Sequence, residues 1–458
     1  MTQSPSSTVA HDFATGSVAR HITALAIPAT AAQLVQLLYS VVDRIYLGHL
    51  EGTSQMALTG LGLCFPLTAF ILAVCNLCAG GAAPLSAMYR GKGELNFAER
   101  ILGCSCMLLI VSALSLTVLF YLFLEPLLRL CGASNLSLPY AKSYMCFYLP
   151  GTLCSMLGTG LSYFMTSQGF AREAMRCTLA GALANIILDP IFIFSLNLGI
   201  QGAAIASVLA QILVCVLVLR FCLSNRPLLH LRREYLCLKW TCVKPIVALG
   251  LSGFVMQGTN AIVQIACNIT LRRFGGDLFI GIMTILSSLR DLIALPMMSL
   301  THSAQPVIAF NFGAGVLTRV QKAVNFITKV SVLYLLIAWG LILLFPAPLI
   351  ALFGGDGAML EEGIHALHLY FMGFFFMALH GCGQATFVGL NLPKPAIFFS
   401  LMRKVFIVVP LTLTLPYVAN LGSDGVFIAE PISNVINGII CYGCMRLTLH
   451  HLSVHGRH

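Results

Sequence analysis

Acidic side chains inside long apolar stretches are the residues of this sequence that could do chemistry. Asp43 lies near the end of "LLYSVVDRIYLG", and Asp189 lies in "NIILDPIFIF". A carboxylate within a membrane span costs several kcal/mol unless it is paired or reached by water, so such residues mark ion or substrate pathways. The two aspartates are therefore the first candidates for a functional site.

Helical spacing gives each aspartate a polar neighbour. Tyr39 and Asp43 are four residues apart, as are Asn185 and Asp189, and residues at that spacing share one helix face. Counted at about 1.5 Å per residue, both aspartates and Ser207 fall at a similar depth in the outer half of the membrane. We therefore expect these five residues to converge.

Two chemistries fit this group of oxygen atoms. Burial disfavours the charged form of a carboxylate, and two neighbouring acids favour retaining one proton between them. A hard cation such as sodium also prefers oxygen ligands. The sequence predicts a proton or sodium site formed by Asp43, Asn185, Asp189 and Ser207. The structural alternative is that Asp43 caps a helix end and Asp189 braces the turn before Pro190.

The second half of the chain carries five more charged residues within apolar stretches: Arg290, Asp291, Arg403, Lys404 and Glu430. Arg290 and Asp291 are adjacent, about 100° apart on a helix, and are not expected to face each other simply. We expect a cross-helix ion pair instead, for example Arg403 or Lys404 with Asp291. Glu430 is either an acid of a substrate cavity or a partner of a neighbouring helix.

The elements that must position these residues are membrane spans. Of the 458 residues, 58% are hydrophobic and 9% charged, whereas about a quarter of the residues of a soluble domain are charged. A helix of about 20 residues crosses the hydrocarbon core. Twelve runs of that size are expected near residues 20–47, 55–79, 100–123, 138–162, 174–195, 201–223, 245–270, 278–303, 322–346, 363–388, 395–418 and 425–448.

Lys and Arg fix the expected orientation, because positively charged loops stay in the cytoplasm. Most of the 26 basic residues fall in the tails and the even-numbered connections. Both termini are therefore expected in the cytoplasm and the protein in the plasma (inner) membrane. The formal charge of +10 is scattered rather than gathered in a patch, which argues against nucleic-acid binding. The 17 cysteines fall mostly in apolar runs and are interpreted as small buried residues.

The two halves of the chain repeat. "PLSAMYRGKG" from Pro84 aligns with "PVIAFNFGAG" from Pro306, and "LGIQGAAIAS" aligns with "LGSDGVFIAE" at nearly the same offset. Two related sets of six spans in the same orientation predict two lobes around a central cleft. The expected domains are a polar tail (1–18), an N-lobe (19–224), a basic linker (225–243), a C-lobe (244–449) and a C-terminal tail (450–458).

The two aspartates of the first half have no acidic counterpart in the second half. Cys267 stands opposite Asp43, and Pro410 or Leu411 stands opposite Asp189. None of these can replace a carboxylate. Ion coupling is therefore expected in the first lobe alone.

With Pro28, Asp43 fifteen residues later, "NIILDPIFIF" and "LGIQGAAIAS", the chain resembles the multidrug and toxic compound extrusion (MATE) family over all twelve spans. The resemblance implies export of organic, often cationic and aromatic compounds in exchange for protons or sodium. It also implies that Asp43, Tyr144, Asn185, Asp189 and Ser207 surround the ion, and that a kink at Pro28 helps to release substrate.

This sequence departs from another branch of the family, which relies on acids in spans 7 and 10. Gln257, Gln264 and His380 are the nearest polar residues there. The stretch "YFMGFFFMALHGCGQ" either lines an adaptable apolar cavity or packs in the core and against lipid. The candidate substrate-cavity residues are Met256, Gln257, Gln264, Tyr370, Phe374, His380 and Glu430.

The function that the sequence predicts is ion-coupled antiport of cationic amphipathic compounds by alternating access, performed by a monomer that contacts small organic molecules and lipid. No cofactor other than H⁺ or Na⁺ is expected. A lipid-linked saccharide flippase of related architecture is the main alternative, and it would favour a more basic cavity. Motifs of hydrolases, metalloproteases and nucleotide-binding enzymes are absent from the sequence, so an enzyme is not expected.

Overall fold

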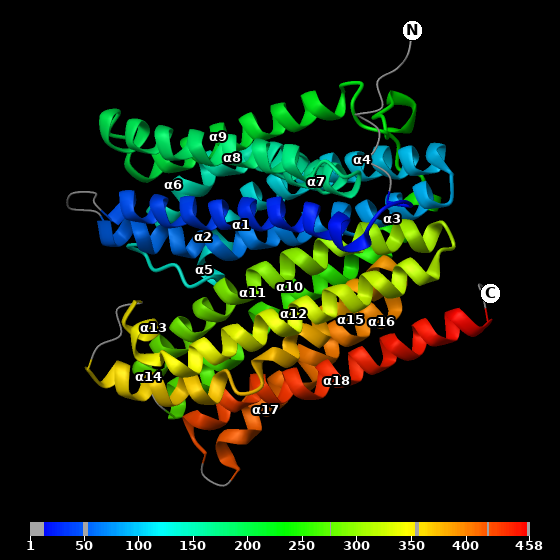
Figure 1. The fold of residues 1–458 in the computed structure, drawn as a ribbon. Helices are drawn as coiled ribbons and strands as arrows, with labels where there is room; N and C mark the ends of the chain where they lie inside the picture. Colours follow the sequence, from blue (N-terminus) through cyan, green and yellow to red (C-terminus); the bar gives the residue numbers. More distant parts are fainter. Residues whose placement is uncertain (1–12, 49–53, 275, 353–356, 419–420, 456–458) are drawn as a thin grey trace. The chain divides into compact units, whose positions relative to one another are not determined.

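The computed structural model describes residues 13–48, 54–274, 276–352, 357–418 and 421–455, and within these residues all regular elements are helical (Figure 1). Residues 1–12 of the predicted N-terminal tail and residues 456–458 of the predicted C-terminal tail lie outside the described residues. Ten described helices are long and apolar enough to cross a membrane, and a bent pair of helices gives an eleventh. The first six predicted spans correspond to α1 (Val18–Gly48), α2 (Ser54–Cys75) continued by η1 (Asn76–Gly80) and α3 (Ala82–Gly91), α4 (Leu95–Leu122), α6 (Leu138–Tyr148) with α7 (Thr152–Ser167), α8 (Ala171–Pro190) with η3 (Ile191–Ser195), and α9 (Gly199–Cys222).

The second half follows the same plan. Its six predicted spans correspond to α10 (Trp240–Phe274), α11 (Gly276–Gly313), α12 (Leu317–Leu344), α14 (Gly357–Tyr370) with α15 (Met377–Gly389), α16 (Pro393–Leu401) with η6 (Met402–Val408) and α17 (Val409–Thr414), and α18 (Ser423–His455). Two short helices, α5 (Leu124–Leu130) and α13 (Pro346–Leu352), lie in connections.

The predicted fourth span is broken, and the tenth is a pair of helices bent by 46°. The 3₁₀ turn η2 (Leu149–Gly151) separates α6 from α7, and Pro150 at its centre has no backbone N–H to donate to the preceding turn. Neither fragment alone reaches the length of a span. Together they occupy the predicted fourth segment.

Contacts divide the chain into two compact units. The first contains residues 27–254, together with residues before Gly16, and the second contains residues 16–26 and 255–458. The start of α1 thus belongs to the second unit, and the start of α10 belongs to the first. The domain limits expected from the repeat stay predictions.

In the first unit, α9 packs against α6, α7 and α8 (Figure 1). A close approach at Gly202 sets the position of α9, because a Cβ there would lie 2.6 Å from the backbone carbonyl of Phe192 in η3. The wide turn η3 begins directly after Pro190, where the proline cannot donate a regular helical hydrogen bond. Asp189 therefore sits at the point where α8 changes to η3.

The linker between the halves is anchored to the first unit. Leu229 is buried, and its backbone N–H donates to Gln168 Oε1 at 3.0 Å. The N–H of His230 donates to the buried Glu99 carboxylate at 3.1 Å, which also pairs with Arg232 Nε at 2.9 Å. The predicted charged linker thus has buried anchor points.

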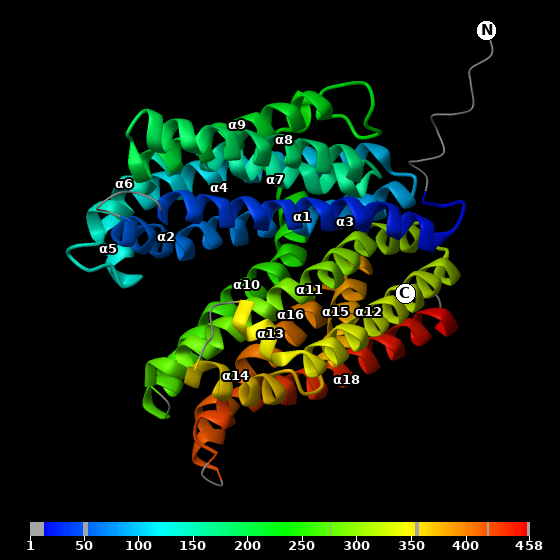
Figure 2. The ribbon, with the colours of Figure 1, turned by 60° about the vertical axis from the view of Figure 1, so that its left-hand side comes forward.

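In the second unit, α18 runs along α14 and α15 and contacts η6 (Figure 2). Aromatic and aliphatic side chains, including Leu286, Phe371, Phe374 and Phe427, form its buried core. The π-helix η6 carries the sequence "MRKVFIV". Its wider turn reduces the angle between successive side chains, which allows Arg403 and Lys404 to point to one partner.

Candidate functional site

The first unit brings Asp43 and Asp189 together. The Asp189 carboxyl is 0% exposed and interacts directly with the Asp43 carboxyl. Asn185, one helical turn before Asp189, donates from Nδ2 to Asp189 Oδ1 at 3.3 Å. The two acids, distant in sequence, therefore belong to one polar cluster formed by α1 and α8.

Hydroxyl groups complete this polar cluster. Tyr39 lies within electrostatic range of both aspartates. Tyr144 of α6 lies within electrostatic range of Asp43 and hydrogen-bonds to Ser207 of α9. The residues expected at the ion site, namely Tyr39, Asp43, Tyr144, Asn185, Asp189 and Ser207, are thus linked by hydrogen bonds or by electrostatic interactions.

Tyr148 also belongs to this cluster, although it was not predicted from the sequence. Its ring stacks on Tyr144, with centroids 5.6 Å apart, its hydroxyl accepts a hydrogen bond from Gln211 Nε2 at 3.1 Å, and it also interacts with Tyr39. The signal that could have found it is the spacing of four residues between Tyr144 and Tyr148, which places both rings on one face of α6.

The cluster offers oxygen atoms to an ion. Asn185 is 1% exposed, and its Oδ1 accepts no hydrogen bond within the described part of the chain. A buried amide oxygen without a donor is unusual. With two carboxyls and several hydroxyls close by, the donor set fits either Na⁺, which takes oxygen ligands, or a proton shared by the acids.

Pro28, the predicted hinge, is buried within α1. The helix continues through Pro28. A membrane helix tolerates a proline when neighbouring groups hydrogen-bond to the backbone carbonyl that the proline leaves without a donor. The hinge role stays a prediction.

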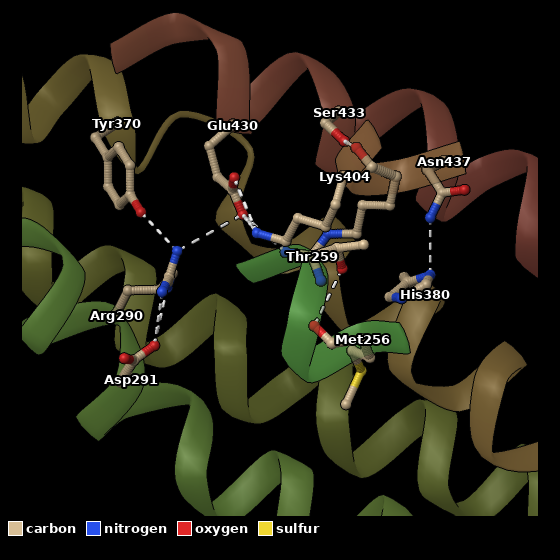
Figure 3. Close-up of polar contacts among 11 residues, drawn as sticks. Met256, Thr259, Arg290, Asp291, Tyr370, His380, Lys404, Glu430, Ser433 and Asn437 are labelled. Carbon is tan, nitrogen blue, oxygen red and sulfur yellow. Dashed lines mark hydrogen bonds and ion pairs between the residues drawn. The ribbon is translucent and has the colours of Figure 1, made fainter. Parts of the chain in front are cut away.

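A second charged cluster occupies the other unit (Figure 3). Glu430 of α18 is 4% exposed, and its Oε1 lies 2.9 Å from both Arg403 Nη2 and Lys404 Nζ. Arg290 Nη1 of α11 lies 3.8 Å from the same oxygen and donates to the Tyr370 hydroxyl at 3.0 Å. Three cations thus surround one buried acid.

Two expectations for this cluster were wrong. Arg290 does face its neighbour, because Nε and Nη2 both donate to Asp291 Oδ1, at 3.0 and 2.9 Å. The long guanidinium side chain folds back across the 100° between them. Arg403 and Lys404 pair with Glu430, not with Asp291. Glu430 pairs with neighbouring helices, which is one of the two alternatives, and it also lines a small cavity, so its role as a substrate-cavity acid stays a prediction.

A small cavity lies beside Glu430. Its polar lining consists of Gln264, Ser287, Arg290, Tyr370, Thr412 and Glu430.

The other candidate cavity residues lie elsewhere. His380 is buried and its Nδ1 lies 2.8 Å from Asn437 Nδ2 (Figure 3). Phe374 packs against Phe371 in the core, with ring centroids 5.0 Å apart. Met256 and Gln257 are partly buried and do not line this cavity. Their roles stay predictions.

Comparisons with known proteins agree over nearly the full length of the chain. The family model MatE matches residues 28–191 and 254–414. The chain is 25% identical to a protein named FAD transporter from Shewanella oneidensis, covering 94% of this chain and 95% of that protein. It is 23% identical to the multidrug export protein MepA of Staphylococcus saprophyticus, covering 82% of this chain and 83% of that protein.

Solved structures show the same fold. A crystal structure of MATE in the bent conformation superposes with a TM-score of 0.92 at 21% sequence identity, covering 98% of this chain and 99% of that one. The family match, the apolar helices and the shared twelve-helix fold lead to one conclusion: the chain belongs to the MatE family of integral membrane transporters and is not an enzyme.

Proposed function

We propose that this protein is an antiporter that exports small organic molecules in exchange for protons or sodium. The observation that carries the proposal is the direct interaction of Asp43 with Asp189 in a buried, oxygen-rich cluster. Membrane-embedded acids are costly and are retained where they bind ions. The relatives named multidrug export protein support export of organic compounds.

Ion binding must be linked to a change in conformation. A ligand shifts an equilibrium between two states only by as much as it binds one of them more tightly. An ion held by Asp43 of α1 and Asp189 of α8 stabilises the arrangement in which these helices are close. Binding of the ion from outside therefore reshapes α1, and this change is the proposed link to expulsion of the cargo by alternating access.

Gradient-driven transport tests the coupling. The protein is reconstituted in liposomes, and dye efflux is measured while sodium and pH gradients are varied separately. Asp43→Asn and Asp189→Asn should abolish gradient-driven efflux. Glu125→Gln is the matched control, because Glu125 is an exposed acid of the same unit that pairs with Arg129. Full activity of the double variant Asp43→Asn/Asp189→Asn would refute the assignment.

The charge of the cargo is a separate question, since the sequence predicts a cationic compound. The names of the similar proteins cover both multidrug export and FAD transport, and FAD carries a negatively charged diphosphate. The buried charges of the second unit are mainly positive. These observations favour a cargo with an anionic group over a purely cationic one.

A lipid-linked saccharide flippase is the second candidate, and the basic residues around Glu430 are the observation that favours it. The acid pair of the first unit favours the antiporter instead. Flipping of a labelled lipid-linked saccharide in liposomes without an ion gradient would establish the flippase and exclude the antiporter.

We also propose that the protein works as a monomer in the plasma (inner) membrane with both termini in the cytoplasm. The distribution of Lys and Arg supports this orientation. A membrane-impermeant label applied to intact cells should fail to reach a tag at either end.

A further inference from the structure

The cluster around Glu430 contains more positive than negative charge. Arg290, Arg403 and Lys404 all approach Glu430 Oε1. Asp291 is the second acid, and its side chain is 69% exposed. Buried Glu430 is therefore the single interior acid that opposes three cations at this place in the described structure, with Asp291 screened at the surface.

Unbalanced charge within a membrane span is costly unless a counter-ion or water reaches it. Arg290 gives such access, because its side chain is 18% exposed and lines the small cavity beside Glu430. The exposed Asp291 next to it indicates that this side of α11 faces water, since an ionised carboxylate in contact with lipid would be strongly disfavoured. An anion can therefore reach Arg290, while Arg403 and Lys404 do not line the cavity and pair with Glu430, which does.

An unused hydrogen-bonding group lies beside Glu430. Arg403 is 8% exposed, and its Nε has no hydrogen-bond partner among the residues described. Thr412 lines the cavity together with Tyr370 and Gln264. A guanidinium N–H and a hydroxyl are the donors that bind carboxylates and phosphates.

We propose that Arg290, Arg403 and Lys404 bind an anionic group, a carboxylate or a phosphate, of the transported molecule, a role that rests on the proposed export function. Glu430 occupies the same donors when no such molecule is bound. It acts as an internal competitor, which weakens anion binding and permits release of the cargo.

Anion-dependent stability of the purified full-length protein tests this site. Thermal unfolding is followed in a non-ionic detergent with sodium phosphate or sodium benzoate, against sodium chloride at equal ionic strength. A ligand that binds the folded state raises the unfolding temperature with its concentration, which yields an apparent Kd. Stabilisation by phosphate alone identifies a phosphate site, and stabilisation by benzoate alone identifies a carboxylate site.

Two substitutions should act in opposite directions. Arg290→Gln removes a donor and should weaken binding by about tenfold or more, whereas Glu430→Gln removes the competitor and should strengthen it by a similar factor. Arg446→Gln is the matched control, because Arg446 is an exposed base of the same unit that donates to Asn325 at 2.8 Å. It should leave the apparent Kd unchanged.

The outcomes separate binding from a structural role and from the proposed export function. A purely structural network predicts that both substitutions lower stability without changing the anion dependence, and that result overturns the proposal. Equal stabilisation of the wild type by chloride and by both probes also overturns it. If Arg290→Gln does not fold, Arg290→Lys should fold and keep binding. Asp43→Asn should lose gradient-driven transport but keep anion binding, so failure of the antiport proposal is distinguishable.

Discussion

Removing the acid of the Glu430 cluster should cost far more stability than removing one of its cations. Glu430 Oε1 lies 2.9 Å from both Arg403 Nη2 and Lys404 Nζ, and 3.8 Å from Arg290 Nη1. Glu430→Gln leaves the buried Arg403 and Lys404 without an acid, whereas Arg290 keeps its pair with Asp291. Lys404→Gln leaves Glu430 paired with both arginines.

The expected magnitudes follow from these partners. Breaking a buried ion pair by removing one member costs about 3–5 kcal/mol when the remaining charge is uncompensated. We therefore expect Glu430→Gln to lower the free energy of unfolding by about 3 kcal/mol and Lys404→Gln by about 1 kcal/mol. For a unit of this size, the first corresponds to a decrease in Tm of about 6–12 °C and the second to about 2–4 °C.

Thermal unfolding in detergent measures this difference, with Arg446→Gln as a control for the loss of an exposed charge. The result that would refute the reasoning is a larger loss of Tm in Lys404→Gln than in Glu430→Gln. That outcome would mean that the cations, and not the acid, hold α11, η6 and α18 together.

Three other predictions concern the first unit. Asn185→Leu should raise the ion concentration needed for half-maximal efflux by about tenfold, because an oxygen is lost from the cluster; an unchanged ion dependence in the liposome assay would contradict a role in ion binding. Gly202→Leu should reduce transport without removing a polar group, since the new side chain would collide with the Phe192 backbone; normal efflux at normal expression would contradict this. Glu99→Gln should release the linker that it anchors through His230 and Arg232, and limited proteolysis should then cut residues 225–239 faster than in the wild type.

The spans could be predicted from the sequence because the length of an apolar run is set by the thickness of the bilayer. The break between α6 and α7 was missed because the apolar run continues through it and only Pro150 marks the turn. Short helices such as α5 and α13 also leave little periodic signal. Their existence depends on packing rather than on composition.

The residues of the acid cluster were predictable from spacing and depth. Asn185 and Asp189 are four residues apart and so share a face of α8. Counting residues along the spans predicted that Asp43 and Ser207 lie at a similar depth in the membrane. Tyr144 came from the family resemblance. The stacking of Tyr148 on Tyr144 could have been inferred from the same spacing.

The partners of Glu430 were less predictable. Helical angles assume short side chains in a regular α-helix, whereas Arg290 bends back onto Asp291 and Arg403 and Lys404 lie in a π-helix. The position of such a wide turn depends on how η6 packs against α18. Neither feature has a local sequence pattern that would reveal it.

Gradient-driven efflux in liposomes, with sodium and pH gradients imposed separately, tests the central claim most directly. One of the two gradients should drive efflux by the wild-type protein and by Glu125→Gln, and neither should drive efflux by Asp43→Asn or Asp189→Asn. Efflux that is independent of both gradients, or that survives replacement of both aspartates, would contradict the account.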